Sequence, residues 1–412
     1  MLRIVDSGNR RAVRDLLAPE RVRDAATDRK VAAIVRDVRK GGDAALLRYA
    51  RKFDRLDGPI EVPLDELRRA AATVPRPVRM AIRDAARNIR TVAKRQVPKG
   101  WRTRVAPGVT VESRVIPLDR VGCYVPGGRY PLPSSLLMTA IPAIVAGVKD
   151  VVAVCPRPEP VVMAAALEAG VSRLFRLGGA HAVAALAYGT ATVPRVDKIV
   201  GPGNRFVASA KALVAGDCGI DFYAGPTEIL IVTASGPADW IAADLLAQAE
   251  HDPDARAVMI TTSRRLAERV AAEVTRQTPA AGPARQSIER HGGIIVCRSM
   301  HDAVALTNDA ASEHVVVGTE SLARRVLNAG AVFIGSWTAQ VAGDYAIGSN
   351  HVLPTAGAAR FRGGLNAADF VKLVSVQRVT KRGLDRIAKT ITTLARAEGL
   401  ESHARSIETR QR

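Results

Sequence analysis

From Val121 onward, short apolar segments alternate with segments of helix length, and this rhythm restricts the fold more than any other feature of the chain. Such alternation predicts βαβ units, in which helices cover the faces of parallel sheets. The predicted strands are residues 151–155, 173–177, 198–200, 228–233, 257–261, 293–297 and 331–335. One doubly wound sheet rarely holds so many strands. We therefore expect two α/β domains, the middle one spanning roughly Val121 to Gly225.

The regions that flank these strands have other periodicities. Between Val22 and Lys94, apolar residues recur at helical spacing, with an interruption at Gly41-Gly42. After Trp101, alternating β-branched residues predict two short strands. The nearly uncharged segment Ser134–Val148 is too short to cross a bilayer and predicts a buried helix. Residues 383–410 keep helical spacing, which predicts a helical tail that must pack against something else.

The net charge of +20 raises nucleic-acid binding as an alternative function. The arginines are, however, scattered over predicted helices, and aromatic residues make up only 4% of the chain. We therefore favour a solvated basic surface and expect neither a nucleic-acid nor a membrane partner. The arginine-bearing N-terminus lacks the apolar core of a signal peptide, and the four cysteines are far apart. These features predict a soluble, cytoplasmic protein with reduced thiols.

Three glycine-rich loops follow predicted strands: YVPGG at 124–128, LGGAH at 177–181 and GPGN at 201–204. At such places in parallel sheets, backbone amides and helix N-termini bind phosphates. None of the loops has the GxGxxG spacing, and each one alone is better explained as a tight turn that needs glycine. Their occurrence together in one domain favours a ligand site.

Several polar residues have the chemistry for metal binding or proton transfer. Gln248 and His251 are three residues apart at the end of a predicted helix, so both side chains could reach one metal ion. Glu313 and His314 open a strand-like segment, and an adjacent acid and imidazole suit proton transfer near neutral pH. Asp344 lies in a loop rich in Gly and Ser, where a carboxylate can reach a cleft. Each residue alone also has a plain structural explanation, and together they define no particular reaction.

Longer motifs extend in a fixed order from about Val121 to the end of the chain. They are YVPGG, PSSLLMTAIPA, LAYGT, VDKIVGPGN, AGPTEILI, DLLAQAEHDPDA, SEHVVV, GDYAIGSNHVLPT and EGLESHARS. In this order they resemble the histidinol dehydrogenase family, and the N-terminal helices are compatible with it. The resemblance implies oxidation of L-histidinol through L-histidinaldehyde to L-histidine, the last steps of histidine biosynthesis. It also implies two NAD per substrate and one zinc ion per site.

The resemblance implies a fold as well. It has two incomplete Rossmann-like parallel-sheet domains, a helical N-terminal segment and an extended helical C-terminal tail that is exchanged in a homodimer. The implied divisions are an N-terminal arm (1–20), a first Rossmann-like domain (21–120 with 228–365), a second one with the NAD-binding loops (121–227), and the tail (366–412). Exchange would give the tail the packing partner that it lacks.

The family motifs also imply a role for individual residues. The zinc ligands would be Gln248, His251, Asp344 and His403, the last from the other subunit, and a shell of N and O donors suits a catalytic site. His314 would remove the hydroxyl proton, and Glu313 would activate water to attack the aldehyde. The implied substrate contacts are Thr227, Gln248, His251, His314, Asp344, Glu398 and His403. The implied NAD contacts are Tyr124, His181 and Asn204.

The chain departs from the family pattern at two of these positions. Thr227 stands where the family usually has Ser, which keeps the hydroxyl group. His181 replaces the usual Gln, and because imidazole is shorter we expect altered dinucleotide affinity. The motifs also read ASEHV for APEHL and GSN for GPN. A relative that oxidises another small alcohol is the alternative enzyme, but the presence of both Glu398 and His403 argues for histidinol.

Overall fold

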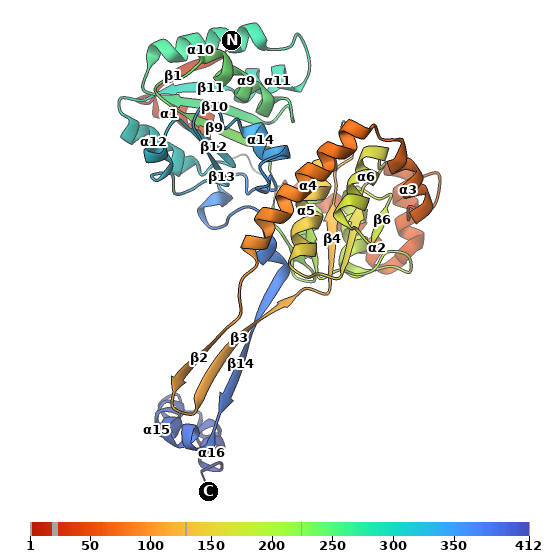
Figure 1. The fold of residues 1–412 in the computed structure, drawn as a ribbon, viewed down its shortest axis with the longest axis vertical. Helices are drawn as coiled ribbons and strands as arrows, with labels where there is room; N and C mark the ends of the chain where they lie inside the picture. The colour runs from red at the N-terminus through yellow and green to blue at the C-terminus, as the bar shows by residue number, and fades with distance from the viewer. Residues whose placement is uncertain (1, 19–23, 128–129, 224, 412) are drawn as a thin grey trace.

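The protein, seen in a computed structural model, has two parallel sheets covered by helices and an antiparallel ribbon that projects away from both (Figure 1). The structure describes residues 2–18, 24–127, 130–223 and 225–411. Within these residues, no helix is both long enough and apolar enough to cross a membrane. The α/β prediction is therefore confirmed, and all of the strands expected between residues 151 and 335 are present.

The larger sheet has six parallel strands in the order β1-β11-β10-β9-β12-β13. Its strands are β1 (Arg3–Asp6), β9 (Glu228–Val232), β10 (Arg256–Thr261), β11 (Gly293–Val296), β12 (His314–Val317) and β13 (Ala331–Ile334). The helices of this part are α1 (Arg10–Leu17), α9 (Ala238–Ala249), α10 (Arg264–Gln277), α11 (Pro283–His291), α12 (Met300–Ala310), α13 (Glu320–Ala323) and α14 (Gln340–Tyr345). All five residues of β9 are buried, as expected for a central strand covered on both faces.

The smaller sheet has five parallel strands in the order β6-β5-β4-β7-β8. Its strands are β4 (Arg120–Tyr124), β5 (Asp150–Val154), β6 (Arg173–Phe175), β7 (Lys198–Val200) and β8 (Gly219–Ile220). The connecting helices are α5 (Pro133–Val145), α6 (Pro160–Ala169), α7 (Gly179–Tyr188) and α8 (Arg205–Val214). Most of α5 is buried, which confirms the buried helix expected from its composition.

The N-terminal helices pack on the smaller sheet, not on the larger one. They are α2 (Ala25–Tyr49), which kinks at Gly42 and continues into the π-turn η1 (Ala50–Asp54), α3 (Leu64–Thr73) and α4 (Arg76–Gln96). Helix α2 packs against α7 and α8, α3 packs against α6, and α4 packs against α5 and α6. Grouping residues 21–120 with 228–365 was therefore wrong for these helices, because an apolar helix face does not specify which sheet it will cover.

The two ends of the chain also differ from expectation. The segment expected to be an arm contributes β1, which pairs in parallel with β11 at the edge of the larger sheet. The tail at 366–412, expected to be only helical, contains the strand β14 (Val371–Val379) and the 3₁₀ turn η3 (Ala367–Phe370). Another 3₁₀ turn, η2 (Ala358–Arg360), precedes it. Both strands lie at sheet edges or are largely exposed, so their sequences lack a continuous apolar run.

The ribbon joins segments from distant parts of the sequence. Strands β2 (Trp101–Ala106) and β3 (Val109–Pro117) form a hairpin, and β14 pairs antiparallel with β3 along its whole length. Helices α15 (Lys381–Ala397) and α16 (Glu401–Glu408) pack together at the far end of the ribbon, away from both sheets (Figure 1). Several apolar side chains here are exposed: Trp101, Val105, Leu373, Val379 and Leu394.

Candidate active site

The predicted acid and base lie at the amino end of the larger sheet. Glu313 precedes β12, His314 begins it, and Glu228 begins the neighbouring strand β9. The two strands pair in parallel with His314 opposite Ile229, so their amino ends lie side by side. Glu313, His314 and Glu228 are all buried. The strand pairing thus brings together side chains that are distant in the sequence.

One backbone segment holds both predicted catalytic side chains. The Glu228 N–H donates to Glu313 Oε2 at 2.8 Å, and the Glu228 carbonyl lies 3.0 Å from His314 Nδ1. A carbonyl can only accept, so Nδ1 carries the proton and Nε2 keeps its lone pair. Burial lowers the pKa of His314, but the Glu313 and Asp344 carboxylates and the Glu228 carbonyl together outweigh it, and the net pKa is raised. His314 is therefore oriented as a base that acts through Nε2.

Polar side chains extend this arrangement in both directions. Gln248 Nε2 donates to Thr227 Oγ1, which in turn donates to Glu313 Oε2. On the other side, Gln340 Nε2 donates to Asp344 Oδ2 at 2.7 Å. Predicted substrate and metal residues thus lie on either side of the acid and base.

Gln340 was not expected from the sequence. It is buried, and its Nε2 lies 3.3 Å from His314 Nε2 as well as next to Asp344. In the sequence it is one polar residue in TAQVAG, four positions before Asp344. It comes close to His314 because it begins helix α14. That spacing on one helix face was the single available signal.

The residues predicted to bind metal have donor atoms without protein partners. Gln248 is fully buried, and within the described residues its Oε1 has no hydrogen-bond partner. Buried acceptors are nearly always satisfied, so this oxygen is suited to bind a metal ion. His251 Nδ1 donates to the Ala247 carbonyl at 3.0 Å, so Nε2 is the ring nitrogen with the lone pair that a metal ion needs. Together with the Asp344 carboxylate, these groups fit a zinc ion with N and O ligands.

One chain alone does not complete this set. Among the described residues, no three His, Cys, Asp or Glu side chains are close enough to hold a metal. Near β12 the predicted ligands are Gln248, His251 and Asp344, and only the last two are His, Cys, Asp or Glu residues. Glu398, at the end of α15, and His403, in α16, lie on the distant tail (Figure 1). A single chain therefore does not bring these two residues to the others.

His351, in the GDYAIGSNHVLPT motif, supports Asp344 from the other side. Its Nδ1 donates to the Asp344 carbonyl at 3.1 Å, and its Nε2 lies 3.4 Å from Ser135 Oγ. Burial lowers the pKa of His351, which favours the neutral ring. Ser135 belongs to α5 of the smaller sheet, so this contact links the two sheets near the candidate site.

One glycine-rich loop follows β6, and the other two follow the carboxyl ends of β4 and β7. The chain leaves these adjacent strands in opposite directions, and such a switch point is where open α/β sheets bind ligands. Asn204 Oδ1 caps α8 by accepting from Phe206 N at 3.0 Å and Val207 N at 3.2 Å. Gly128 of YVPGG, and Ala224 of AGPTEILI, lie outside the described residues.

The other two predicted NAD residues are buried. The Tyr124 hydroxyl accepts from Gly179 N at 2.9 Å, and burial raises its pKa. His181 is 1% exposed, and its Nε2 lies 2.7 Å from Asp54 Oδ2. His181 therefore has a protein partner where we expected it to face a ligand.

A buried ion pair that the sequence did not reveal holds the loop at 201–204. Lys211 and Asp221 are paired with side chains 2% and 1% exposed. Asp221 Oδ2 accepts from Gly201 N at 2.7 Å, and Lys211 Nζ donates to Gly201 O at 3.0 Å. Both backbone groups of Gly201 are thus fixed by charged side chains.

Gly201→Ala is expected to lower the free energy of unfolding by about 1–3 kcal/mol. Gly201 has φ +118°, and a Cβ there would clash with the Tyr124 carbonyl. Urea denaturation measures the change, and Gly216→Ala is the matched control, because a Cβ at Gly216 meets nothing within 4 Å. Equal stability of the two variants would contradict the prediction.

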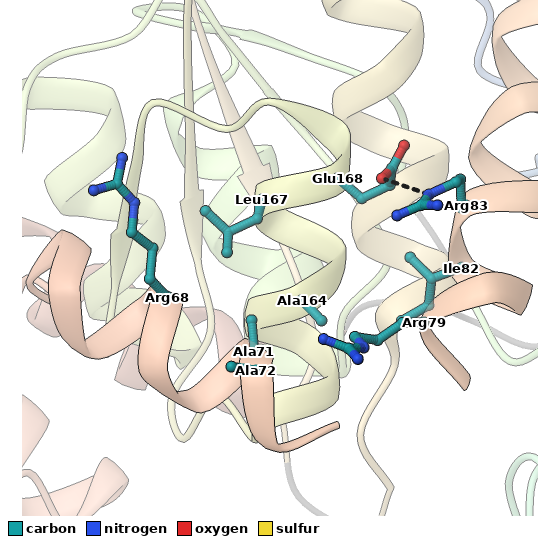
Figure 2. Close-up of a pocket in the computed structure, with 9 residues that line it drawn as sticks. All are labelled: Arg68, Ala71, Ala72, Arg79, Ile82, Arg83, Ala164, Leu167 and Glu168. Atoms are coloured by element: carbon teal, nitrogen blue, oxygen red, sulfur yellow. Dashed lines mark ion pairs between the residues drawn. The ribbon is translucent and has the colours of Figure 1, made fainter. Parts of the chain in front are cut away.

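A pocket of about 340 Å³ lies elsewhere, between α3, α4 and α6 (Figure 2). Small and apolar side chains line it, with Arg68, Arg79 and Arg83 around them. Arg83 pairs with Glu168 at 4.0 Å, and Arg90 binds the same carboxylate at 3.0 Å. This pocket contains none of the predicted site residues, so we place the chemistry at β9 and β12.

Comparisons with known proteins identify the family of the chain. The sequence profile of the histidinol dehydrogenase family matches residues 18–411. A histidinol dehydrogenase of Methylococcus capsulatus is 45% identical over 96% of this chain and 94% of its own length. One of Geobacter sulfurreducens is 47% identical over 92% and 91%. The crystal structure of histidinol dehydrogenase from Elizabethkingia anophelis superposes with a TM-score of 0.94 at 31% identity, covering 99% of this chain and 98% of that one. The chain therefore belongs to the histidinol dehydrogenase family.

Proposed function

We propose that this protein oxidises L-histidinol to L-histidine through L-histidinaldehyde, with NAD as the hydride acceptor and a zinc ion in the site. The observation that carries the proposal is that the backbone of Glu228 hydrogen-bonds to both Glu313 and His314, near the unpaired Gln248 oxygen. It supplies a base, a carboxylate and a metal-binding donor in one buried place.

His314 is the base for the alcohol. Its Nε2 takes the hydroxyl proton as hydride leaves the carbon that bears the hydroxyl, and Nδ1 keeps its own proton, which it donates to the Glu228 carbonyl in a hydrogen bond. The Glu313 carboxylate, 3.5 Å from Nδ1, stabilises the imidazolium that forms. Gln340 lies beside Nε2 and gives way to the substrate hydroxyl, since its own Nε2 remains bonded to Asp344.

Glu313 serves the aldehyde step. Thr227 and Glu228 both donate to Oε2, so Oε1 is the oxygen left to take a proton from water as the water attacks the aldehyde carbon. The hydrate that forms then loses a second hydride together with a hydroxyl proton, which gives the carboxylic acid. Alcohol to acid is a four-electron oxidation, and it requires two NAD because each accepts two electrons.

Gln248, His251 and Asp344 would hold the zinc ion, with His403 of a second subunit. When bound, zinc supplies Lewis acidity and anchors the substrate without redox chemistry. Thr227 positions the Gln248 amide, and Gln340 positions the Asp344 carboxylate, so each ligand side chain has a fixed orientation.

The cofactor would bind at the switch point of the smaller sheet, with Tyr124, His181 and Asn204 as the contacting or supporting side chains. NAD accepts the hydride when bound there. The N-terminus of α8 carries the positive end of the helix dipole, which favours the NAD phosphates. Contacts such as that of His351 with Ser135 connect this sheet to the catalytic one.

The ribbon and tail would be exchanged in a homodimer, so that Glu398 and His403 reach the substrate and zinc of the partner. The exposed apolar side chains of the ribbon and of α15 support this arrangement, because a single chain leaves them unburied.

The test is NADH formation from L-histidinol before chelation, after chelation and after zinc is restored. We expect two NADH per histidinol, loss of turnover on chelation and its return with zinc. Absence of turnover in a zinc-loaded protein would contradict histidinol as the substrate and favour another small alcohol.

Subunit mixing tests the exchange of the tail. His314→Asn and His403→Ala are each expected to be inactive alone. Mixed dimers would contain one site with neither substitution, so co-refolding the two variants is expected to restore activity. Mixed dimers that form but stay inactive would contradict the exchange while leaving the reaction itself open to the NADH assay.

A further inference from the structure

His181 and Asp54 form a buried pair between elements that are far apart in the sequence. His181 lies in the first turn of α7, and Asp54 ends the π-turn η1 that follows α2. Their side chains are 1% and 8% exposed, and His181 Nε2 lies 2.7 Å from Asp54 Oδ2. A carboxylate oxygen in this pair accepts, so Nε2 carries the proton.

The same carboxylate oxygen also holds the glycine-rich loop. Asp54 Oδ2 accepts from Gly178 N at 2.9 Å, and the Tyr124 hydroxyl accepts from the next amide, Gly179 N, at 2.9 Å. Gly179 has φ +56°, a conformation that glycine adopts readily. Two successive loop amides are therefore fixed by two side chains, and one of those side chains is itself fixed by His181.

Aromatic packing fixes the imidazole from a second direction. The His181 ring lies 6.1 Å from the rings of both Tyr49 and Phe53, at interplanar angles of 25° and 31°. Tyr49 is held in turn by the hydrogen bond from its hydroxyl to Asp37 Oδ2 at 2.6 Å. The imidazole is thus both stacked and hydrogen-bonded within the protein.

A ligand role would require His181 to leave this position. Its Nε2 would have to release Asp54, and a buried carboxylate that loses a charged or hydrogen-bonding partner is strongly disfavoured. With the pair intact, the loop is ordered before any ligand arrives, so binding does not have to supply that ordering.

We infer that His181 is a positioning residue of the cofactor site, which acts through Asp54 to hold the loop at Gly178 and Gly179 in its binding conformation. This inference rests on the proposed use of NAD. It assigns Asp54 to the cofactor site and changes the role expected for His181 from contact to support.

A double-mutant cycle tests the pair, with NAD titrated against the zinc-loaded protein and binding measured by calorimetry. His181→Leu and Asp54→Asn are each expected to weaken NAD binding roughly 5- to 20-fold. The double variant is expected to bind NAD no more weakly than either single variant, because both substitutions break the same hydrogen bond between His181 and Asp54. His181→Gln is expected to recover most of the affinity, since its amide N–H can still donate to Asp54. His301→Leu, an exposed histidine of α12, is the matched control and is expected to bind like the parent.

Amide hydrogen exchange of the NAD-free protein gives an independent readout. We expect Gly178 and Gly179 to exchange faster in His181→Leu and Asp54→Asn than in the parent and in His301→Leu. The inference would be overturned if the two losses of NAD affinity multiply in the double variant, or if amide exchange at Gly178 and Gly179 is unchanged. NAD binding by the parent protein would still stand. Failure of the parent to bind NAD would overturn the proposed function and this inference with it.

Discussion

His314→Asn is expected to lower kcat for histidinol oxidation by roughly 10²–10⁴-fold. The asparagine amide can still donate to the Glu228 carbonyl. In the parent protein this carbonyl accepts the hydrogen bond from Nδ1 at 3.0 Å. It has no basic nitrogen at the position of Nε2, so the hydroxyl proton has no acceptor. Steady-state NADH formation measures the loss, and zinc content and melting temperature are expected to match the parent protein.

Glu313→Gln provides the comparison that separates the two oxidation steps. The glutamine keeps a carbonyl oxygen for Thr227 and Glu228 but cannot take a proton from water. We expect this variant to slow oxidation of supplied histidinaldehyde more than oxidation of histidinol. A His314→Asn variant whose kcat is within a few-fold of that of the parent, at equal zinc content and melting temperature, would rule out His314 as the base.

Lys211→Met is expected to reduce the free energy of unfolding by about 3–5 kcal/mol. The substitution leaves the buried Asp221 carboxylate without its cation and removes the donor to the Gly201 carbonyl. Urea denaturation measures the change, and Arg285→Met is the control. Arg285 pairs with Glu289 on an exposed helix face, where an ion pair contributes at most about 1 kcal/mol.

Replacing both members of the pair distinguishes its two contributions. Lys211→Met with Asp221→Leu removes the unpaired charge, so we expect the double variant to be more stable than Lys211→Met alone. A loss below about 1 kcal/mol in Lys211→Met would show that water or another residue compensates Asp221.

The sheets could be predicted because their strands are covered on both faces. Such strands are continuous apolar runs, as in β9, and their separation by helix-length segments indicates parallel pairing. Strands β1 and β14 were missed because they are short or largely exposed, and so carry no apolar run. The side on which α2, α3 and α4 pack could not be predicted, since it depends on contacts between distant segments.

The same distinction applies to the candidate site. Glu313 and His314 are adjacent in the sequence, so their proximity needed no tertiary information. Gln340 and Asp54 have no such local signal, because their roles come from a buried position beside residues far along the chain. Family motifs named His181 as a cofactor residue, whereas its packing against Asp54 and Phe53 emerges only from the fold.

The ribbon also sets an order of assembly. Strand β3 is made before most of either sheet, but its partner β14 is made after the last strand of both. Until synthesis reaches β14, the β2–β3 hairpin is a two-stranded element with little stability of its own. Pairing across so long a stretch of chain is slow compared with the local contacts within each sheet. We therefore expect the ribbon to close last, so that a chain truncated before Val371 folds its sheets but leaves β3 unpaired along the edge that β14 covers.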